Sequence, residues 1–155
     1  FDDDVVFKGY VSDAELRAFY RNAAVVVYPS LYEGFGFPPI EAMASGAAVI
    51  TSDCSSLPEV VGDAAIQVNP YDSDDLAEKI KEVLGNPVLR KKLIELGGRQ
   101  SKKFNWYRVA RNTLSVYADL QGSGNGRLDS GMNKKIWRRL RDMEKKFLEQ
   151  PSSNF

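Results

Sequence analysis

The chain has 155 residues, a formal charge of zero from 21 basic and 21 acidic residues, and a hydrophobic fraction of 43%. This size and composition are typical of one soluble globular domain, and no apolar run reaches the roughly 18 residues that a membrane-spanning helix needs. The single cysteine excludes an internal disulfide, and the absence of histidine excludes histidine acid–base catalysis within the chain. The acidic first residues do not resemble a signal peptide, so we expect a cytoplasmic protein.

The first part of the chain alternates strands and helices. Residues 5–7 form a short apolar run that predicts a strand ending near Gly9. Ser12 and Glu15 have the spacing of a capping box, which predicts that a helix begins there. Residues 24–28, with the sequence AVVVY, predict a strand that is buried on both faces of a parallel sheet.

The stretch SLYEGFGFPPIEAMASG, residues 30–46, follows this strand. Its glycines and prolines predict an irregular loop, and the Pro-Pro pair suits the first turn of a helix that continues until Gly46. The loop is therefore expected at the carboxyl end of a strand, where open α/β sheets bind their ligands.

The alternation continues to about residue 120. Strands are predicted at residues 47–51 and 65–68, with a short helical turn at residues 58–61 between them. Capping residues and helix breakers then predict three longer helices, at residues 74–84, 87–97 and 106–120. Strands that alternate with helices predict a parallel, doubly wound, Rossmann-like α/β sheet with about four strands.

Residues 122–155 differ from the rest of the chain. They hold eight Lys and Arg against four Asp and Glu, so they carry about +4 and the remainder carries about −4. We expect an α/β domain at residues 1–121, a flexible linker at 122–132, a basic amphipathic helix at 133–150 and a disordered tail at 151–155. This helix could pack back on the domain or make a peripheral contact with the inner membrane face, and we expect no nucleic-acid binding.

Two carboxylates flank the glycine-rich loop. Glu33 lies in the loop, Glu41 lies near the start of the next helix, and both can accept hydrogen bonds from neutral hydroxyl groups. Gly34 and Gly36 let the backbone approach a ligand and expose amide donors. A sugar nucleotide, with a diol at each end and a diphosphate near the helix N-terminus, fits this pattern. Each glutamate could also be structural, with Glu41 as a favourable acid in the first helical turn.

The segment from Glu33 to Gly46 resembles the signature of the retaining GT-B glycosyltransferases of family 4, in which seven residues separate two glutamates. Four other stretches resemble that family in the same order, at residues 7–12, 28–30, 56–62 and 105–106. The resemblance covers residues 1 to about 120. It implies that residues 1–121 are part of the C-terminal, nucleotide-sugar-binding Rossmann-like domain of such an enzyme.

The resemblance also implies a role for each residue of the site. Glu33 would be the catalytic residue beside the donor sugar, and Glu41 would hold the nucleotide ribose. The backbone amides that would bind sugar hydroxyls belong to Phe35, Gly36 and Phe37. The segment that would border the base consists of Gly9, Tyr10 and Val11. The reaction would transfer a hexose from a nucleotide-diphosphate sugar to an acceptor glycan, lipid or small molecule, with retained configuration and without a metal or other cofactor.

Two parts of the family pattern are not found in this sequence. They are the Arg/Lys pair that neutralises the donor diphosphate and the N-terminal acceptor domain. We therefore expect the chain to be inactive alone and to be completed by an N-terminal domain or a partner chain, and an exposed sheet edge would favour an oligomer. The sequence also leaves open a non-catalytic sugar-nucleotide-binding or scaffolding module, and a GT-B epimerase or hydrolase.

Overall fold

The computed structural model describes residues 4–122, together with Arg138 and Asp142. The linker predicted at residues 122–132 and the helix predicted at residues 133–150 therefore lie outside the described residues, except for Gly122, Arg138 and Asp142. Their boundaries stay a prediction, as does that of the tail.

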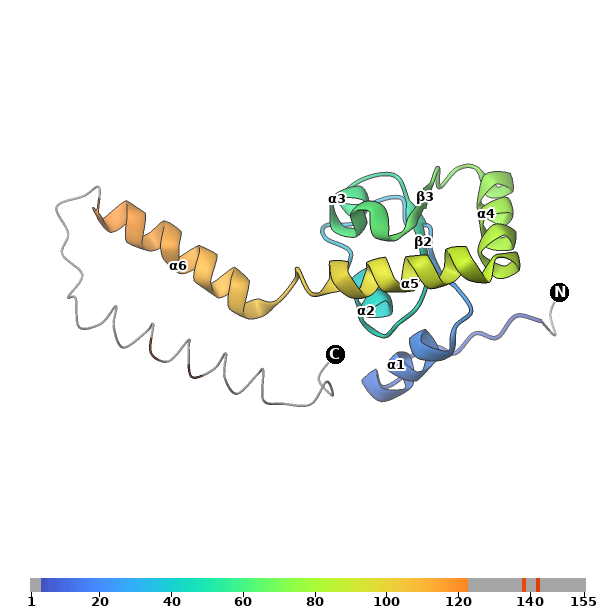
Figure 1. Ribbon diagram of the computed structural model, residues 1–155, viewed down its shortest axis with the longest axis horizontal. Coiled ribbons are helices and arrows are strands. Elements are labelled where there is room, and N and C mark those ends of the chain that lie inside the picture. Colours follow the sequence, from blue (N-terminus) through green and yellow to red (C-terminus); the bar gives the residue numbers. More distant parts are fainter. Residues whose placement is uncertain (1–3, 123–137, 139–141, 143–155) are drawn as a thin grey trace. The chain divides into compact units, whose positions relative to one another are not determined.

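The chain divides into two compact units. The first ends at Lys102, and the second begins at Lys103. All strands of the described chain belong to the first unit, and the described helix of the second unit is α6, Trp106–Gly122 (Figure 1).

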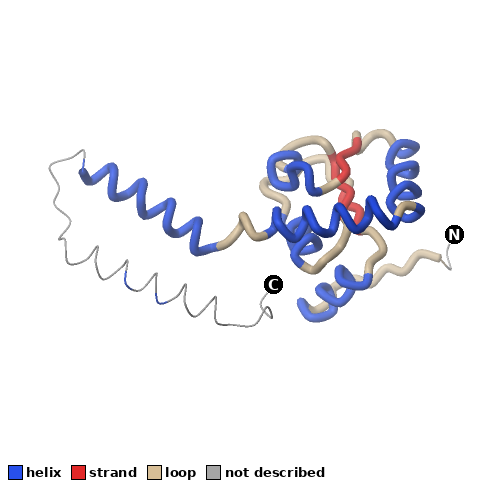
Figure 2. The backbone as a smooth tube through the Cα atoms, viewed as in Figure 1, coloured by secondary structure: helices blue, strands red, loops and turns tan. Residues whose placement is uncertain are grey.

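Three parallel strands, red in Figure 2, form the sheet in the order β1-β2-β3. Strand β1 is Val26–Tyr28, β2 is Val49–Ser52 and β3 is Ile66–Val68. The parallel α/β architecture confirms the predicted fold class. The expectation that residues 24–28 are buried on both faces is wrong, because β1 is half-buried at an edge of the described sheet, whereas the central β2 is fully buried.

The strand predicted at residues 5–7 is not formed. Val5, Val6 and Phe7 are 53%, 67% and 93% exposed, and they pair with no strand of the described chain. An apolar run becomes a strand only when a neighbouring strand takes its backbone hydrogen bonds. Here β1 pairs with β2, and β2 pairs with β3. Residues 5–7 pair with no strand of the described chain.

Helices connect and cover the strands. The helices of the first unit are α1 (Asp13–Asn22), α2 (Phe37–Ala44), α3 (Leu57–Val61), the 3-10 helix η1 (Gly62–Ala64), α4 (Ser73–Gly85) and α5 (Pro87–Ser101). No helix in the described part of the chain is long and apolar enough to cross a membrane.

Capping residues begin α1, α4 and α5 of this unit, and also α6. The caps at Ser12, Asp72 and Asn105 are predicted by the sequence, whereas Asn86 is expected only as part of a helix break and proves to be the N-cap of α5. The hydroxyl of Ser12 accepts from the N–H of Glu15, and the Glu15 carboxylate accepts from the N–H of Ser12 at 2.9 Å, which completes a capping box. The side chains of Asp72, Asn86 and Asn105 each accept a hydrogen bond from the backbone N–H three residues later. These bonds pair amide groups that a helix N-terminus would otherwise leave free.

Helix α5 extends four residues beyond its predicted end at residue 97. Gly97 is buried, and a Cβ atom there would lie 3.0 Å from Cγ of Met43 in α2. The glycine therefore permits α5 to pack closely on α2 instead of ending the helix. Through this contact, α5 supports the helix that carries Glu41.

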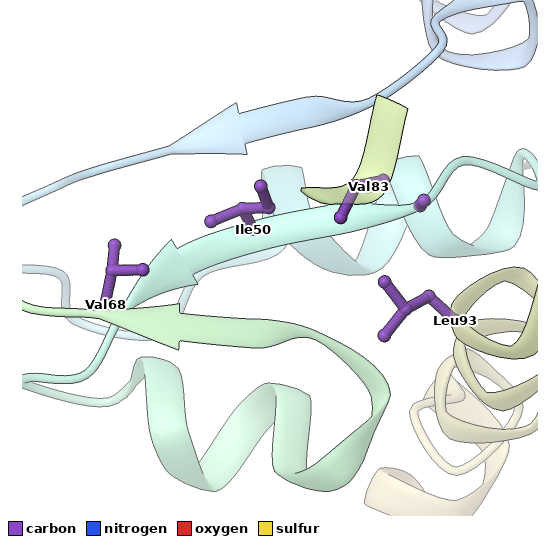
Figure 3. Packing of buried hydrophobic residues seen from close by; sticks show 5 residues of the cluster. Ile50, Val68, Val83 and Leu93 are labelled. Carbon is purple, nitrogen blue, oxygen red and sulfur yellow. The ribbon is translucent and has the colours of Figure 1, made fainter. Parts of the chain in front are cut away.

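A hydrophobic cluster joins the sheet to α4 and α5. Ile50 of β2 and Val68 of β3 pack with Val83 of α4 and Leu93 of α5, and each is at most 5% exposed (Figure 3). Burying an aliphatic side chain of this size contributes roughly 1.5–3 kcal/mol relative to leaving it in water. The cluster holds the strands in place, and the loops that follow β1 and β2 extend from this rigid sheet.

Candidate functional site

Two loops leave the same edge of the sheet. Residues 29–36 follow Tyr28, the last residue of β1, and residues 53–56 follow Ser52, the last residue of β2. Because β1 and β2 are parallel, both loops lie at the carboxyl edge, as the sequence predicts for the first one. The candidate site is built from these two loops and from α1 and α2.

Three serines at the end of β2 and in the loop after it hold the backbone around Glu33. We call them the serine clamp: Ser52, Ser55 and Ser56. The hydroxyl of Ser52 donates to the carbonyl of Ser30 at 2.6 Å. The hydroxyl of Ser55 accepts from the N–H of Glu33 at 3.1 Å and donates to its carbonyl at 2.7 Å. The hydroxyl of Ser56 lies 3.0 Å from this carbonyl and 2.8 Å from the carbonyl two residues later. The backbone of Glu33 is thus held on both sides.

The side chain of Glu33 is held as well. Its Oε1 accepts one hydrogen bond from the Tyr28 hydroxyl at 2.5 Å and another from the Ser30 hydroxyl at 2.9 Å. The Tyr28 hydroxyl, followed by that of Ser30, keeps the pKa of Glu33 below its ordinary value, against the opposing effect of burial. The bond to Glu33, followed by burial, raises the pKa of Tyr28 to about 12. At neutral pH the pair is therefore a carboxylate and a protonated phenol.

Glu41 is an exposed residue of α2. It is the fifth residue of the helix, and the first turn contains no acidic residue. The interpretation of Glu41 as a first-turn acid is therefore wrong, since the helix dipole acts mainly within that turn. Burial, followed by the negative charge of Glu41, raises the pKa of Tyr20 in α1, and Tyr20 in turn contributes to the raised pKa of Tyr28. The two glutamates thus lie in one region, connected electrostatically through two tyrosines.

Helix α2 has few backbone donors at its N-terminus. Gly36 is the N-cap with φ +109°, Phe37 is the first helical residue, and the two prolines that follow have no N–H. The amides of Gly36 and Phe37 donate to no acceptor in the described chain. Unpaired amides at a helix N-terminus can bind phosphate or sugar oxygens, so these two groups are candidate ligand contacts.

Two aromatic rings flank these amides. The centroids of Phe35 and Phe37 are 4.8 Å apart with an interplanar angle of 50°, and the two residues are 38% and 53% exposed. The backbone of Phe35 belongs to the clamped loop through its carbonyl. All three residues that the resemblance assigns to sugar binding therefore lie between Glu33 and Glu41.

The segment assigned to the base lies before α1. Gly9 has φ +60°, Tyr10 is 97% exposed and Val11 is half-buried. Within the described chain, no hydrogen bond connects these three residues to the loop or to α2. Their role at the base stays a prediction.

The hydroxyl groups around Glu33 are not among the site residues expected from the sequence. These groups belong to Tyr28, Ser30 and the serine clamp. A signal for the clamp is present in the sequence, because Ser55 and Ser56 belong to the loop after β2, which is the next strand along the chain after β1. Loops after neighbouring parallel strands share one edge of the sheet, so polar residues in one can reach the other.

Comparisons with known proteins agree with this arrangement. The family model described as "Glycosyl transferases group 1" matches residues 1–100. Over 111 residues, the chain is 40% identical to the O-antigen chain mannosyltransferase B of Escherichia coli, covering 72% of this chain and 29% of that protein. It is 41% identical over 111 residues to the MMP alpha-(1->4)-mannosyltransferase of Mycolicibacterium hassiacum, covering 69% of this chain and 27% of that protein.

A solved structure is similar as well. The sucrose-phosphate synthase from Thermosynechococcus elongatus matches with a TM-score of 0.70 and 33% identity, over 79% of this chain and 31% of that protein. This similarity confirms the predicted Rossmann-like fold of a GT-B enzyme. The chain spans less than a third of each of these three proteins.

Proposed function

Since the chain belongs to the family Glycosyl transferases group 1, we propose that it is the donor-binding part of a retaining glycosyltransferase. The reaction transfers a hexose from a nucleotide-diphosphate sugar to an acceptor. Two of the similar proteins are named as mannosyltransferases, which supports mannose as the hexose. The observation that carries the proposal is the region in which Glu33 and Glu41 flank two unpaired amides.

The proposed roles follow from the chemistry of these groups. When the bond between the sugar and the diphosphate breaks, positive charge develops at the anomeric carbon, and an ionised carboxylate at Glu33 stabilises that charge. The amides of Gly36 and Phe37 bind oxygen atoms of the sugar or the phosphates. Glu41, which is exposed, accepts hydrogen bonds from the two ribose hydroxyls.

The proposed reaction also needs an acceptor site and cations beside the diphosphate. Two carboxylates beside a diphosphate repel it unless cations compensate their charge. The similar proteins extend well beyond the segment that this chain matches. We infer that the acceptor site and the cations that neutralise the diphosphate belong to those further parts, carried by the same polypeptide or by a partner chain.

Substitution of the two glutamates separates their roles. In a transfer-competent enzyme that contains this chain, Glu33→Gln should lower kcat by about a hundredfold because it removes the charge beside the anomeric carbon. Glu41→Gln should weaken the binding of a nucleoside diphosphate by about tenfold and leave the binding of its 2′,3′-dideoxy analogue unchanged. Steady-state kinetics and calorimetry measure the two effects.

An exposed glutamate far along the chain provides the control. Glu95→Gln in α5 should change neither kcat nor nucleotide binding. Full turnover in the Glu33→Gln enzyme would instead favour the non-catalytic module. Release of free hexose, or of an epimerised donor, would favour the hydrolase or epimerase.

A further inference from the structure

The two oxygens of the Glu33 carboxylate have different surroundings. Oε1 accepts from both Tyr28 and Ser30, at 2.5 and 2.9 Å. Oε2 accepts no hydrogen bond from any described residue. A carboxylate can accept about four hydrogen bonds, so Oε2 retains its full capacity for a ligand.

The groups that hold Oε1 are themselves fixed. Tyr28 ends β1, where it is in register with Thr51 of the fully buried β2. The carbonyl of Ser30 accepts from Ser52 of the serine clamp at 2.6 Å. The backbone of Glu33 is held by Ser55. Because both the backbone and Oε1 are restrained, the direction of Oε2 is restrained too.

We propose that Tyr28 is a positioning residue, whose hydroxyl, with that of Ser30, holds Oε1 of Glu33 and thereby presents Oε2 to a hydroxyl or a developing positive charge on the sugar. This inference rests on the proposed function. Tyr28 does not touch the sugar, and it acts through Glu33. The same hydrogen bond lowers the pKa of Glu33 and raises that of Tyr28, so it favours an ionised carboxylate beside a protonated phenol, the state that stabilises positive charge.

The substitution Tyr28→Phe isolates the hydroxyl. The ring keeps its volume, and Glu33 is only half-buried, so water can replace the lost donor without leaving a buried unpaired group. Tyr71→Phe is the matched control, because Tyr71 is 81% exposed and its hydroxyl makes no hydrogen bond with any described residue.

Titration of the 155-residue chain tests the pairing directly. The chain is labelled with 13C at the glutamate carboxyl and tyrosine Cζ carbons, and signals are assigned from the Glu33→Gln and Tyr28→Phe variants. In Tyr28→Phe, the pKa of Glu33 should rise toward its ordinary value. In Glu33→Gln, the pKa of Tyr28 should fall from about 12 toward its ordinary value near 10. Tyr71→Phe should change neither.

A double-mutant cycle in the transfer-competent enzyme tests the function of the pair. Tyr28→Phe should lower kcat by about tenfold with little change in the donor KM, because the contact matters most when charge develops. The acid limb of its pH profile should move to higher pH, since the pKa of Glu33 rises. In the Glu33→Gln background, Tyr28→Phe should have no further effect on kcat.

Different results would contradict the pairing of Tyr28 with Glu33 and the proposed function of the enzyme. Unchanged pKa values of Glu33 in Tyr28→Phe and of Tyr28 in Glu33→Gln would overturn the pairing, whatever the activity. If Tyr28→Phe lowers kcat by the same factor in the wild-type enzyme and in the Glu33→Gln enzyme, Tyr28 is only structural. If both pKa values shift as predicted but no assay detects transfer, the proposed function is overturned and the pairing of Tyr28 with Glu33 stands.

Discussion

At Gly36, both the loop conformation and the core packing require a glycine. Its φ of +109° lies in the region that favours glycine, and a Cβ atom there would lie 2.8 Å from Cδ2 of the fully buried Leu57. Gly34, in the same loop, has no positive φ, and a Cβ atom there would meet no other atom within 4 Å. The same role is expected for both glycines from the sequence, but only Gly36 has a backbone conformation and a close neighbour that require glycine.

A pair of alanine substitutions tests this difference. Gly36→Ala should lower the free energy of unfolding by about 1–3 kcal/mol, through backbone strain and the clash with Leu57. Gly34→Ala should change it by less than about 1 kcal/mol. Urea denaturation of the chain measures both, and equal losses in the two variants would contradict the special role of Gly36.

At the same scale, the candidate site could be predicted only in part. The spacing of Glu33 and Glu41 and the two glycines between them are local features, and they predict the loop that the structure has after β1. The partners of the Glu33 backbone are not predictable from local spacing, because Ser55 and Ser56 are 22 and 23 positions away. Such contacts depend on the register of β1 against β2, which the pattern of residues does not reveal.

At the scale of the elements, the helices were predictable because their signals are local. Ser12, Asp72, Asn86 and Asn105 each begin a helix through a hydrogen bond to a residue three positions later. Strands depend on partners instead. Residues 24–28, 47–51 and 65–68 contain strands that pair with one another, whereas residues 5–7 have no partner in the described chain.

Asn86 connects two elements, as the C-cap of α4 and the N-cap of α5. Its side chain accepts from the N–H of Leu89 at 3.0 Å. Asn86→Ala should therefore lower the free energy of unfolding by about 1 kcal/mol, whereas Asn86→Asp, which keeps the acceptor, should preserve most of it. Thermal denaturation compares the two variants. An equal decrease in the free energy of unfolding in both would show that the Asn86 cap does not stabilise α5.

At the scale of the whole molecule, the described sheet serves mainly to bring separate segments to one edge. Helix α1 contributes Tyr20, β1 contributes Tyr28, the loop contributes Glu33 and α2 contributes Glu41. Helix α5 packs on α2 through the close approach at Gly97. This unit thus brings the residues of the candidate site together, although the chain spans less than a third of the similar proteins.

The central claim, that this region binds a sugar nucleotide, is tested most directly by amide chemical-shift mapping of a 15N-labelled, transfer-competent enzyme that contains this chain, with nucleoside-diphosphate mannose carrying guanine, uracil or adenine. With at least one donor, saturable shift changes should appear at Glu33, Gly36, Phe37 and Glu41, and α4 should remain unchanged. The matching nucleoside diphosphate without sugar should affect Glu41 but not Glu33. The absence of saturable changes at the loop with every donor, or changes confined to other parts of the chain, would contradict the account.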